Sequence, residues 1–234
     1  MAGLVVVTGG TKGIGRAILE KFASNGYDVC TCARKKAELE SLAADFGKKY
    51  KVKIHHRVAD LSITDQVANF VEFVNQLGQQ VDVLVNNAGQ FVGGAITEEP
   101  SGALEAMIAA NLYSAYHTTR GLVGGMKQQR HGHIFNMCSV ASFMAYPNGG
   151  SYAITKFALL GFSKSLREEL KSYGVRVTAI LPGAVRTASW DGTDLPNDRF
   201  MKSEDVANTV FSAYMLSKQS VVEEIVMRPM LGDI

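Results

Sequence analysis

The feature that most constrains the fold is an alternation, along the whole chain, of short apolar segments and stretches of helical periodicity. The apolar segments are rich in Val, Ile and Leu, and several, such as LVVV at 4–7, are apolar throughout. Continuous apolar runs are typical of strands covered on both faces, as in parallel sheets. The seven segments expected to form strands are 4–8, 28–34, 53–60, 81–86, 133–139, 175–181 and 223–228.

Helical periodicity fills the intervals between these segments, at 15–24, 35–48, 64–77, 101–129, 152–172 and 203–217. The alternation predicts one doubly wound α/β domain over 1–234, with helices on both faces of a seven-stranded parallel sheet in the order 3-2-1-4-5-6-7. The irregular segment 183–201 departs from this pattern. Irregular segments of this length inside a domain usually serve as lids or binding loops, so we expect it to contact substrate.

Composition excludes several classes of protein. The net charge of +2 is too small for a nucleic-acid-binding or anionic-membrane-binding surface. No run of 18 apolar residues and no leader occurs, and the three cysteines suit reduced thiols, so we expect a cytoplasmic protein. The histidine pairs, at 55–56 and at 131 and 133, lack a third ligand at suitable spacing, and we expect no metal.

A glycine-rich turn, TGGTKGIG at 8–15, links the first expected strand directly to a helix. Glycines at such a turn let free backbone N–H groups and the positive end of the helix dipole approach a pyrophosphate. The spacing G-x-x-x-G-x-G is neither the common dinucleotide fingerprint nor a P-loop. Its position between strand and helix nevertheless predicts a nucleotide site.

The end of the second expected strand indicates which nucleotide is bound. The strand runs into Arg34, Lys35 and Lys36, and the first carboxylate after it is Glu38. NAD sites place an acidic residue there, whereas NADP sites use cations for the 2′-phosphate. Arginine suits bidentate phosphate recognition, so we predict NADP(H), bound by Arg34 with Lys12 from the glycine-rich turn. Lys36 is interpreted as a solvated side chain.

A tyrosine and a lysine, Tyr152 and Lys156, stand four residues apart on one helix face. Bringing a phenol from a pKa near 10 to near 7 takes ~4 kcal/mol, about what one ammonium at ~4 Å supplies. Ser139 ends a strand, where parallel sheets bind ligands. The same spacing recurs at Tyr214 and Lys218, which end the last expected helix without a polar partner and are interpreted as surface residues.

These motifs together resemble the short-chain dehydrogenase/reductase superfamily over nearly the whole chain. The matching residues are TGGTKGIG at 8–15, Asp60, NNAG at 86–89, Asn111, Ser139, Tyr152, Lys156, and Pro182 and Gly183 leading to Thr187. The resemblance implies that Tyr152 donates a proton to a carbonyl and that Ser139 holds the carbonyl oxygen. It implies that Lys156 lowers the pKa of Tyr152 and binds the nicotinamide ribose, and that Asn111 positions a relay water.

The resemblance also implies a complete NADP(H) site and a homodimer or homotetramer that packs the helices around Asn111 and Tyr152. Asp60 and Leu61 would meet the adenine, and Val185 and Thr187 the carboxamide. For two of the asparagines a purely structural role is the alternative: Asn86 would brace the sheet, and Asn111 would be a hydrogen-bonded polar residue inside a helix. The expected cofactor residues are Gly9, Thr11, Lys12, Gly13, Ile14, Gly15, Arg34, Asp60, Leu61, Asn87, Ala88, Gly89, Tyr152, Lys156, Pro182, Gly183, Val185 and Thr187.

The last part of the chain, 183–190 and 221–234, resembles bacterial sepiapterin reductase-like members of the superfamily. The expected activity is NADPH-dependent reduction of a ketone or aldehyde, with a pteridine side-chain ketone or similar small carbonyl as substrate. The alternatives are a 3-oxoacyl-(acyl-carrier-protein) reductase, whose usual Asp-Gly-Gly tail segment is absent here, and a non-catalytic NADP(H)-binding sensor. We expect a flat or apolar substrate to bind between Phe91 and Trp190, with Phe143 and Tyr146 nearby. Asp191 or Asp233 is a candidate to bind a cationic group of the substrate.

Overall fold

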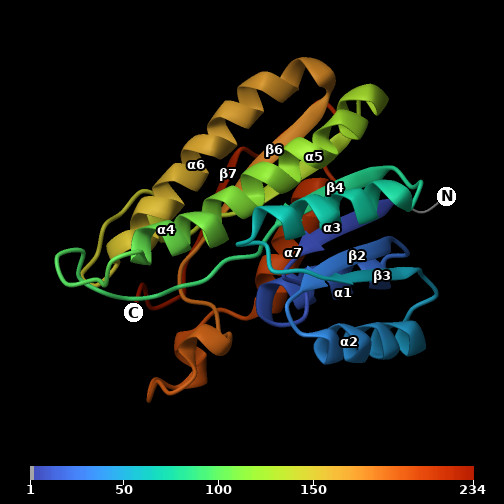
Figure 1. Cartoon of the computed structure of the whole chain (residues 1–234). Coiled ribbons are helices and arrows are strands. Elements are labelled where there is room, and N and C mark those ends of the chain that lie inside the picture. Colours follow the sequence, from blue (N-terminus) through green and yellow to red (C-terminus); the bar gives the residue numbers. More distant parts are fainter. Residues whose placement is uncertain (1–2) are drawn as a thin grey trace.

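A parallel sheet forms the centre of the computed structural model, which describes residues 3–234 (Figure 1). Its seven strands follow the order β3-β2-β1-β4-β5-β6-β7, and every neighbouring pair is parallel. The predicted fold class and strand order are therefore confirmed. The strands are β1 (Leu4–Thr8), β2 (Asp28–Ala33), β3 (Ile54–Val58), β4 (Val81–Asn86), β5 (Gly132–Met137), β6 (Val175–Pro182) and β7 (Glu224–Met227).

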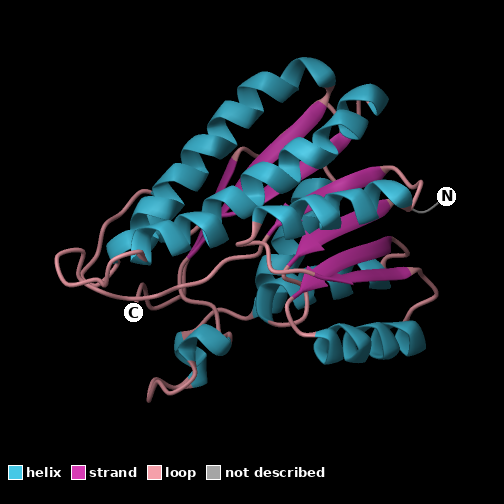
Figure 2. Ribbon diagram, in the orientation of Figure 1, coloured by secondary structure: helices cyan, strands magenta, loops and turns pink. Residues whose placement is uncertain are grey.

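Helices cover both faces of the sheet (Figure 2). One face packs α1 (Gly13–Ser24), α2 (Lys36–Lys49) and α7 (Ser203–Tyr214), and the other packs α3 (Thr64–Gln76), α5 (Ser114–Gln129) and α6 (Gly150–Leu170). Val5 and Val7 of β1 enter the first core, while Leu4 and Val6 enter the second. The strand is apolar from Leu4 to Val7 because both of its faces are buried. Among the described residues, no helix has the length and hydropathy needed to cross a membrane.

The helix expected over 101–129 is interrupted by a wider turn. It consists of α4 (Ala103–Ile108), a π-helical turn (Ala109–Tyr113) and α5. The backbone N–H of Ser114 bonds to the carbonyl of Ala109, which lengthens the turn by one residue and contradicts a uniform α-helix. Such turns occur frequently at functional sites. Here the turn carries Asn111.

Tyr214 is buried, so its interpretation as a surface residue is wrong. Its ring packs edge-on against Phe22 and Tyr27, and the guanidinium of Arg176 lies over it. The last turn of α7 is covered because α7 packs along α1. Lys218, four residues further on, is exposed as expected.

Stability at acidic pH is expected to depend on His133, a buried residue of β5. Its Nε2 lies 2.7 Å from the Thr178 hydroxyl, whereas its Nδ1 has no partner among the described residues. Burial, with the Arg176 charge, lowers the pKa of His133 well below 6.5. Because the unfolded chain takes up this proton first, the free energy of unfolding is expected to fall as pH drops below about 6.5, by up to ~1.4 kcal/mol per pH unit until the folded-state pKa is reached.

Urea unfolding of wild type and His133→Gln between neutral and mildly acidic pH measures this contribution. The glutamine cannot take up the proton, so its pH dependence is expected to be shallower. Equal slopes for the two proteins would contradict the assignment.

Candidate active site

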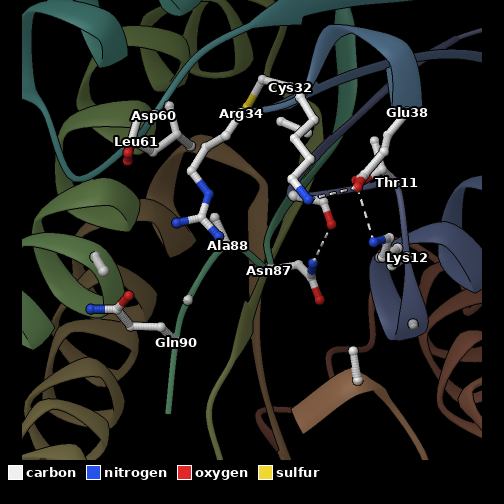
Figure 3. Close-up of a pocket in the computed structure, with 18 of the residues that line it drawn as sticks. Thr11, Lys12, Cys32, Arg34, Glu38, Asp60, Leu61, Asn87, Ala88 and Gln90 are labelled. Carbon is white, nitrogen blue, oxygen red and sulfur yellow. Dashed lines mark hydrogen bonds and ion pairs between the residues drawn. The ribbon is translucent and has the colours of Figure 1, made fainter. Parts of the chain in front are cut away.

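Two adjoining cavities open at the carboxyl ends of the strands. The first, of about 480 Å³, lies beside the glycine-rich turn, the end of β2 and the segment after β4. The second, of about 650 Å³, shares several lining residues with it, including Ile14, Asn87 and Gly89, so the two form one cleft. The expected cofactor residues that line the first cavity are Gly9, Thr11, Lys12, Gly13, Ile14, Gly15, Arg34, Asp60, Leu61, Asn87, Ala88, Gly89 and Thr187 (Figure 3).

The glycine-rich turn has the close-packed geometry that a dinucleotide phosphate requires. Gly13 adopts φ +51°, and a Cβ on Gly15 would lie 2.5 Å from the Gly9 carbonyl. The side chain of Asn87 donates to the carbonyls of Thr8 and Gly9, which ties the turn to the end of β4. No side chain caps α1, so its first N–H groups are available at the cleft. These residues fit a pyrophosphate at the start of the helix.

A carboxylate, Glu38, lies in the first cavity and is held by three neighbours. Lys12 Nζ is 2.9 Å and Lys35 Nζ 3.6 Å from Glu38 Oε1, and the Thr11 hydroxyl donates to Oε2 at 3.1 Å (Figure 3). The hydrogen bond from Lys12 is the main cause that lowers the pKa of Glu38. Sequence reasoning treated Glu38 only as the first carboxylate after the strand. Its position three residues after Lys35, in the first turn of α2, was the available signal.

Arg34 is the cation of this cavity that remains unpaired: its guanidinium forms no ion pair with any residue in 3–234. Figure 3 shows its side chain extending into the cavity on the side of Asp60 and Ala88. Hydrogen bonds from Ser62, helped by the Arg34 charge, hold the pKa of Asp60 below its usual value against the effect of burial. The cavity therefore presents a free guanidinium near an ionised carboxylate.

The second cavity collects the expected catalytic side chains. Ser139, Tyr152 and Lys156 line it, with the expected cofactor residues Pro182, Gly183 and Val185. Ser139 follows β5 at the start of a short 3-10 turn (Val140–Ser142), and its hydroxyl accepts from the Ala141 N–H at 3.1 Å. Tyr152 and Lys156 stand in the first two turns of α6.

Burial, rather than Lys156, dominates the acidity of Tyr152. It raises the pKa of the phenol, while contact with the Ser139 hydroxyl opposes part of that rise. Lys156 is itself buried, which lowers its pKa, and its Nζ donates to the Met137 carbonyl at 2.7 Å. Nζ lies 5.6 Å from the Tyr152 ring centroid. The ammonium of Lys156 is directed to a backbone carbonyl, and the lowering of the Tyr152 pKa by Lys156 stays a prediction.

Asn111 lines neither cavity and braces the segment after β4. Its Oδ1 accepts from the Gln90 N–H at 2.7 Å, and its Nδ2 donates to the Gln90 carbonyl at 3.0 Å and to the Thr155 hydroxyl at 3.1 Å. Asn86 is also buried and donates to Asn136 on the neighbouring strand at 2.8 Å. Both contacts match the structural alternatives stated for these residues. A relay water at Asn111 stays a prediction.

The expected substrate residues divide into two groups. The aromatic residues among them that line the second cavity are Phe91, Tyr146 and Trp190. Phe143 and Asp191 line neither cavity, and Phe143 instead lies beneath the Arg228 guanidinium. Asp233 does line the second cavity, but its carboxylate is paired with Arg228. Neither Asp191 nor Asp233 therefore offers the second cavity a free carboxylate for a cationic substrate group.

The segment 183–201 leaves β6 and projects from the carboxyl edge of the sheet, in orange in Figure 1. A bridge between Val185 and Met201 closes its base. Beyond the bridge, the Trp190 ring packs edge-on against Phe200 at 5.1 Å. Sequence reasoning located the segment but not this closure, which depends on pairing between residues sixteen apart.

Comparison with known proteins gives the family. A family model described as short chain dehydrogenase matches residues 3–196. The chain belongs to the short-chain dehydrogenase/reductase family, and it is an oxidoreductase of that family.

Relatives with known names extend the match to the full length. A sepiapterin reductase of Chlorobaculum tepidum is 31% identical, with 100% of this chain and 99% of the relative covered. An alcohol dehydrogenase of Thermococcus sibiricus, in complex with 5-hydroxy-NADP, superposes with a TM-score of 0.93 at 27% identity over 100% of this chain and 99% of that one. L-Sorbose reductase of Gluconobacter frateurii, with NADPH and L-sorbose, gives a TM-score of 0.88 at 29% identity, covering 98% and 96%.

Proposed function

We propose that the protein is an NADPH-dependent carbonyl reductase that converts a ketone or aldehyde to the alcohol. The observation that carries this proposal is the juxtaposition of Tyr152, Ser139 and Lys156 in a cavity continuous with the cleft beside the glycine-rich turn. A sensor without catalysis would have no use for a phenol beside the Ser139 hydroxyl at this position.

The residues of the second cavity have separate roles in the proposed reduction. When bound, NADPH would be the source of the hydride that reaches the carbonyl carbon. Tyr152 gives a proton to the carbonyl oxygen; burial raises the pKa of the phenol, so it holds that proton at neutral pH until negative charge develops on the oxygen. Ser139 donates to the same oxygen and stabilises its developing negative charge. Lys156 would hold the nicotinamide ribose hydroxyls with the ammonium protons that are not donated to the Met137 carbonyl.

The proposed choice of NADPH over NADH rests on Arg34. A guanidinium with no carboxylate partner among the described residues suits bidentate binding of the 2′-phosphate. Glu38 is occupied by Lys12, Lys35 and Thr11, so it is a poor acceptor for a ribose hydroxyl. The NADP-type ligands of the Thermococcus and Gluconobacter proteins support the same choice.

The proposed substrate is a small carbonyl compound with a flat or apolar body, such as a pteridine side-chain ketone. Aromatic side chains line the second cavity, and the full-length similarity to the Chlorobaculum sepiapterin reductase supports this class. We propose that 1–234 acts as one domain, with 183–201 as its substrate loop. A homodimer or homotetramer is supported by exposed apolar side chains on the helices around the site, namely Tyr113, Tyr116, Ile154 and Phe157.

A panel of carbonyl compounds tests this function. NADPH oxidation is followed with sepiapterin, a 3-oxoacyl thioester, simple diketones and aromatic aldehydes, and the best case is repeated with NADH. Turnover of the small carbonyls with NADPH supports the proposal. Turnover of the thioester alone would replace it with 3-oxoacyl reduction, and tight NADPH binding with no turnover would favour the sensor.

Trp190→Ala is expected to lower kcat/KM for a bicyclic ketone by about tenfold and to change kcat/KM for a simple diketone little. An aromatic contact contributes up to about 1.5 kcal/mol, which is about tenfold. Phe143→Ala is the matched control, because that exposed ring lies outside the cavity. An equal loss with both substrates would contradict a role in discrimination.

A further inference from the structure

The start of α6 is clamped by a carboxylate from a distant segment. Glu99 lies in the segment after β4, and its Oε1 accepts the backbone N–H of Ser151 at 2.9 Å. Its Oε2 accepts the Ser151 hydroxyl. Ser151 is buried in the first turn of the helix and directly precedes Tyr152. One side chain therefore takes both donors of the residue next to the phenol.

The backbone at the start of α6 allows the Glu99 carboxylate to approach it closely. Gly150 adopts φ +40°, and a Cβ there would lie 2.0 Å from Glu99 Oε1 and 2.5 Å from the Gly94 carbonyl. The Gly94 N–H also donates to the Asn148 carbonyl at 3.1 Å. Any side chain at position 150 would displace the carboxylate, so the contact with Ser151 depends on this glycine.

Glu99 supplies the side-chain hydrogen-bond acceptor that the first turn of α6 lacks in its own N-cap residue. Gly149 occupies the N-cap of α6 and offers no side-chain acceptor. The first N–H groups of a helix have no partner within the helix, and a negative charge there is stabilised by the helix dipole. The two bonds from Ser151 hold the pKa of Glu99 below its usual value, so the carboxylate is charged at neutral pH.

The segment that carries Glu99 also touches the phenol directly. The Phe91 ring packs edge-on against Tyr152, with centroids 5.0 Å apart. Gln90 is held by Asn111, which also contacts Thr155 one turn along α6. The segment 90–99 is therefore fixed to the first turns of α6 at several points, of which Glu99 is the charged one.

We propose that Glu99 is a positioning residue for Tyr152: by holding Ser151 it fixes the first turn of α6 and keeps the Tyr152 hydroxyl beside Ser139. This inference rests on the proposed function, because it assumes that Tyr152 donates the proton. Glu99 lines neither cavity and acts only through Ser151.

The test compares Glu99→Ala and Glu99→Gln with wild type in steady-state reduction of the best carbonyl substrate. Small misplacements of a reacting group cost about 10²-fold, so Glu99→Ala is expected to lower kcat by about 10- to 100-fold. Glu99→Gln retains an acceptor oxygen and is expected to lose less. The dissociation constant of NADPH is expected to stay within about twofold, because the phosphate-facing residues around Gly13 and Arg34 lie on other elements and Lys156 is held separately by the Met137 carbonyl.

The matched control is Glu98→Ala. Glu98 is the adjacent exposed carboxylate, and its side chain makes no hydrogen bond or ion pair within residues 3–234. It is expected to keep wild-type kcat. If Glu99→Ala fails to fold, Ser151→Ala serves instead: it removes the hydroxyl donor, leaves the N–H, and is expected to show a partial loss of kcat.

Measuring the effect of Glu99→Ala in a Tyr152→Phe variant distinguishes positioning of the phenol from a general contribution of Glu99 to the fold. Glu99→Ala added to Tyr152→Phe is expected to cause little further loss of kcat. The proposal is overturned if Glu99→Ala and Glu98→Ala have the same kcat, or if the loss of activity in Glu99→Ala comes from weaker NADPH binding. It is also overturned if the losses of kcat from Glu99→Ala and Tyr152→Phe multiply in the double variant. Full activity of Tyr152→Phe alone would instead overturn the proposed function.

Discussion

Tyr152→Phe is expected to lower kcat for carbonyl reduction by about 10²- to 10⁴-fold, the usual contribution of a general acid. The phenol lies partly buried beside Ser139 and is the proposed proton donor to the carbonyl oxygen. Phenylalanine keeps the edge-on packing against Phe91 and removes only the hydroxyl. The dissociation constant of NADPH is expected to change little. Steady-state kinetics and a fluorescence titration with NADPH measure the two quantities.

Tyr146→Phe distinguishes the proton donor from any phenol in the cavity. Tyr146 lines the same cavity, so removing its hydroxyl is expected to act mainly on the KM of the carbonyl substrate. A kcat for Tyr152→Phe within tenfold of wild type would contradict the assignment. So would a loss as large in Tyr146→Phe.

Arg34→Gln is expected to weaken NADPH binding by about 10- to 100-fold and NADH binding by less than about threefold. Hydrogen bonds to charged groups contribute about 1.5–3 kcal/mol, and each 1.4 kcal/mol is tenfold in affinity. The effect is confined to the phosphorylated cofactor because the proposed contact is with the 2′-phosphate. Titration of the protein with each reduced cofactor measures the ratio.

Lys36→Gln provides the control for the loss of one positive charge. Lys36 lies two residues from Arg34, pairs with Glu40 at 3.6 Å and does not line the cleft. Its variant is expected to bind both cofactors as wild type does. An equal loss of NADPH and NADH affinity in Arg34→Gln would contradict recognition of the 2′-phosphate.

The fold follows from the sequence because the constraint on each strand is local. In β1, consecutive residues enter opposite cores, so positions 4–7 must all be apolar, and the same holds for most of β4. Such runs, separated by helical periodicity, leave few topologies other than a doubly wound sheet. The glycine-rich turn was equally predictable, because its glycines and its place between strand and helix are both visible in the chain.

Features that depend on contacts between distant segments were not predictable in this way. The Tyr152 and Lys156 spacing fixes their common helix face, but it says nothing of the Met137 carbonyl that takes the ammonium or of the burial that raises the Tyr152 pKa. Tyr214 is buried only because α7 packs on α1. Glu99 lies 52 residues from Ser151, and neither residue carries a signal of the other.

Transfer of deuterium from labelled NADPH tests the central claim most directly. The cofactor is labelled at the nicotinamide carbon that gives up the hydride, and the alcohol formed from the best carbonyl substrate is analysed by mass spectrometry. The account predicts one deuterium on the former carbonyl carbon, formed by the wild type and nearly lost in Tyr152→Phe. Oxidation of NADPH without a labelled alcohol, or tight NADPH binding with no product from any substrate class, would contradict it.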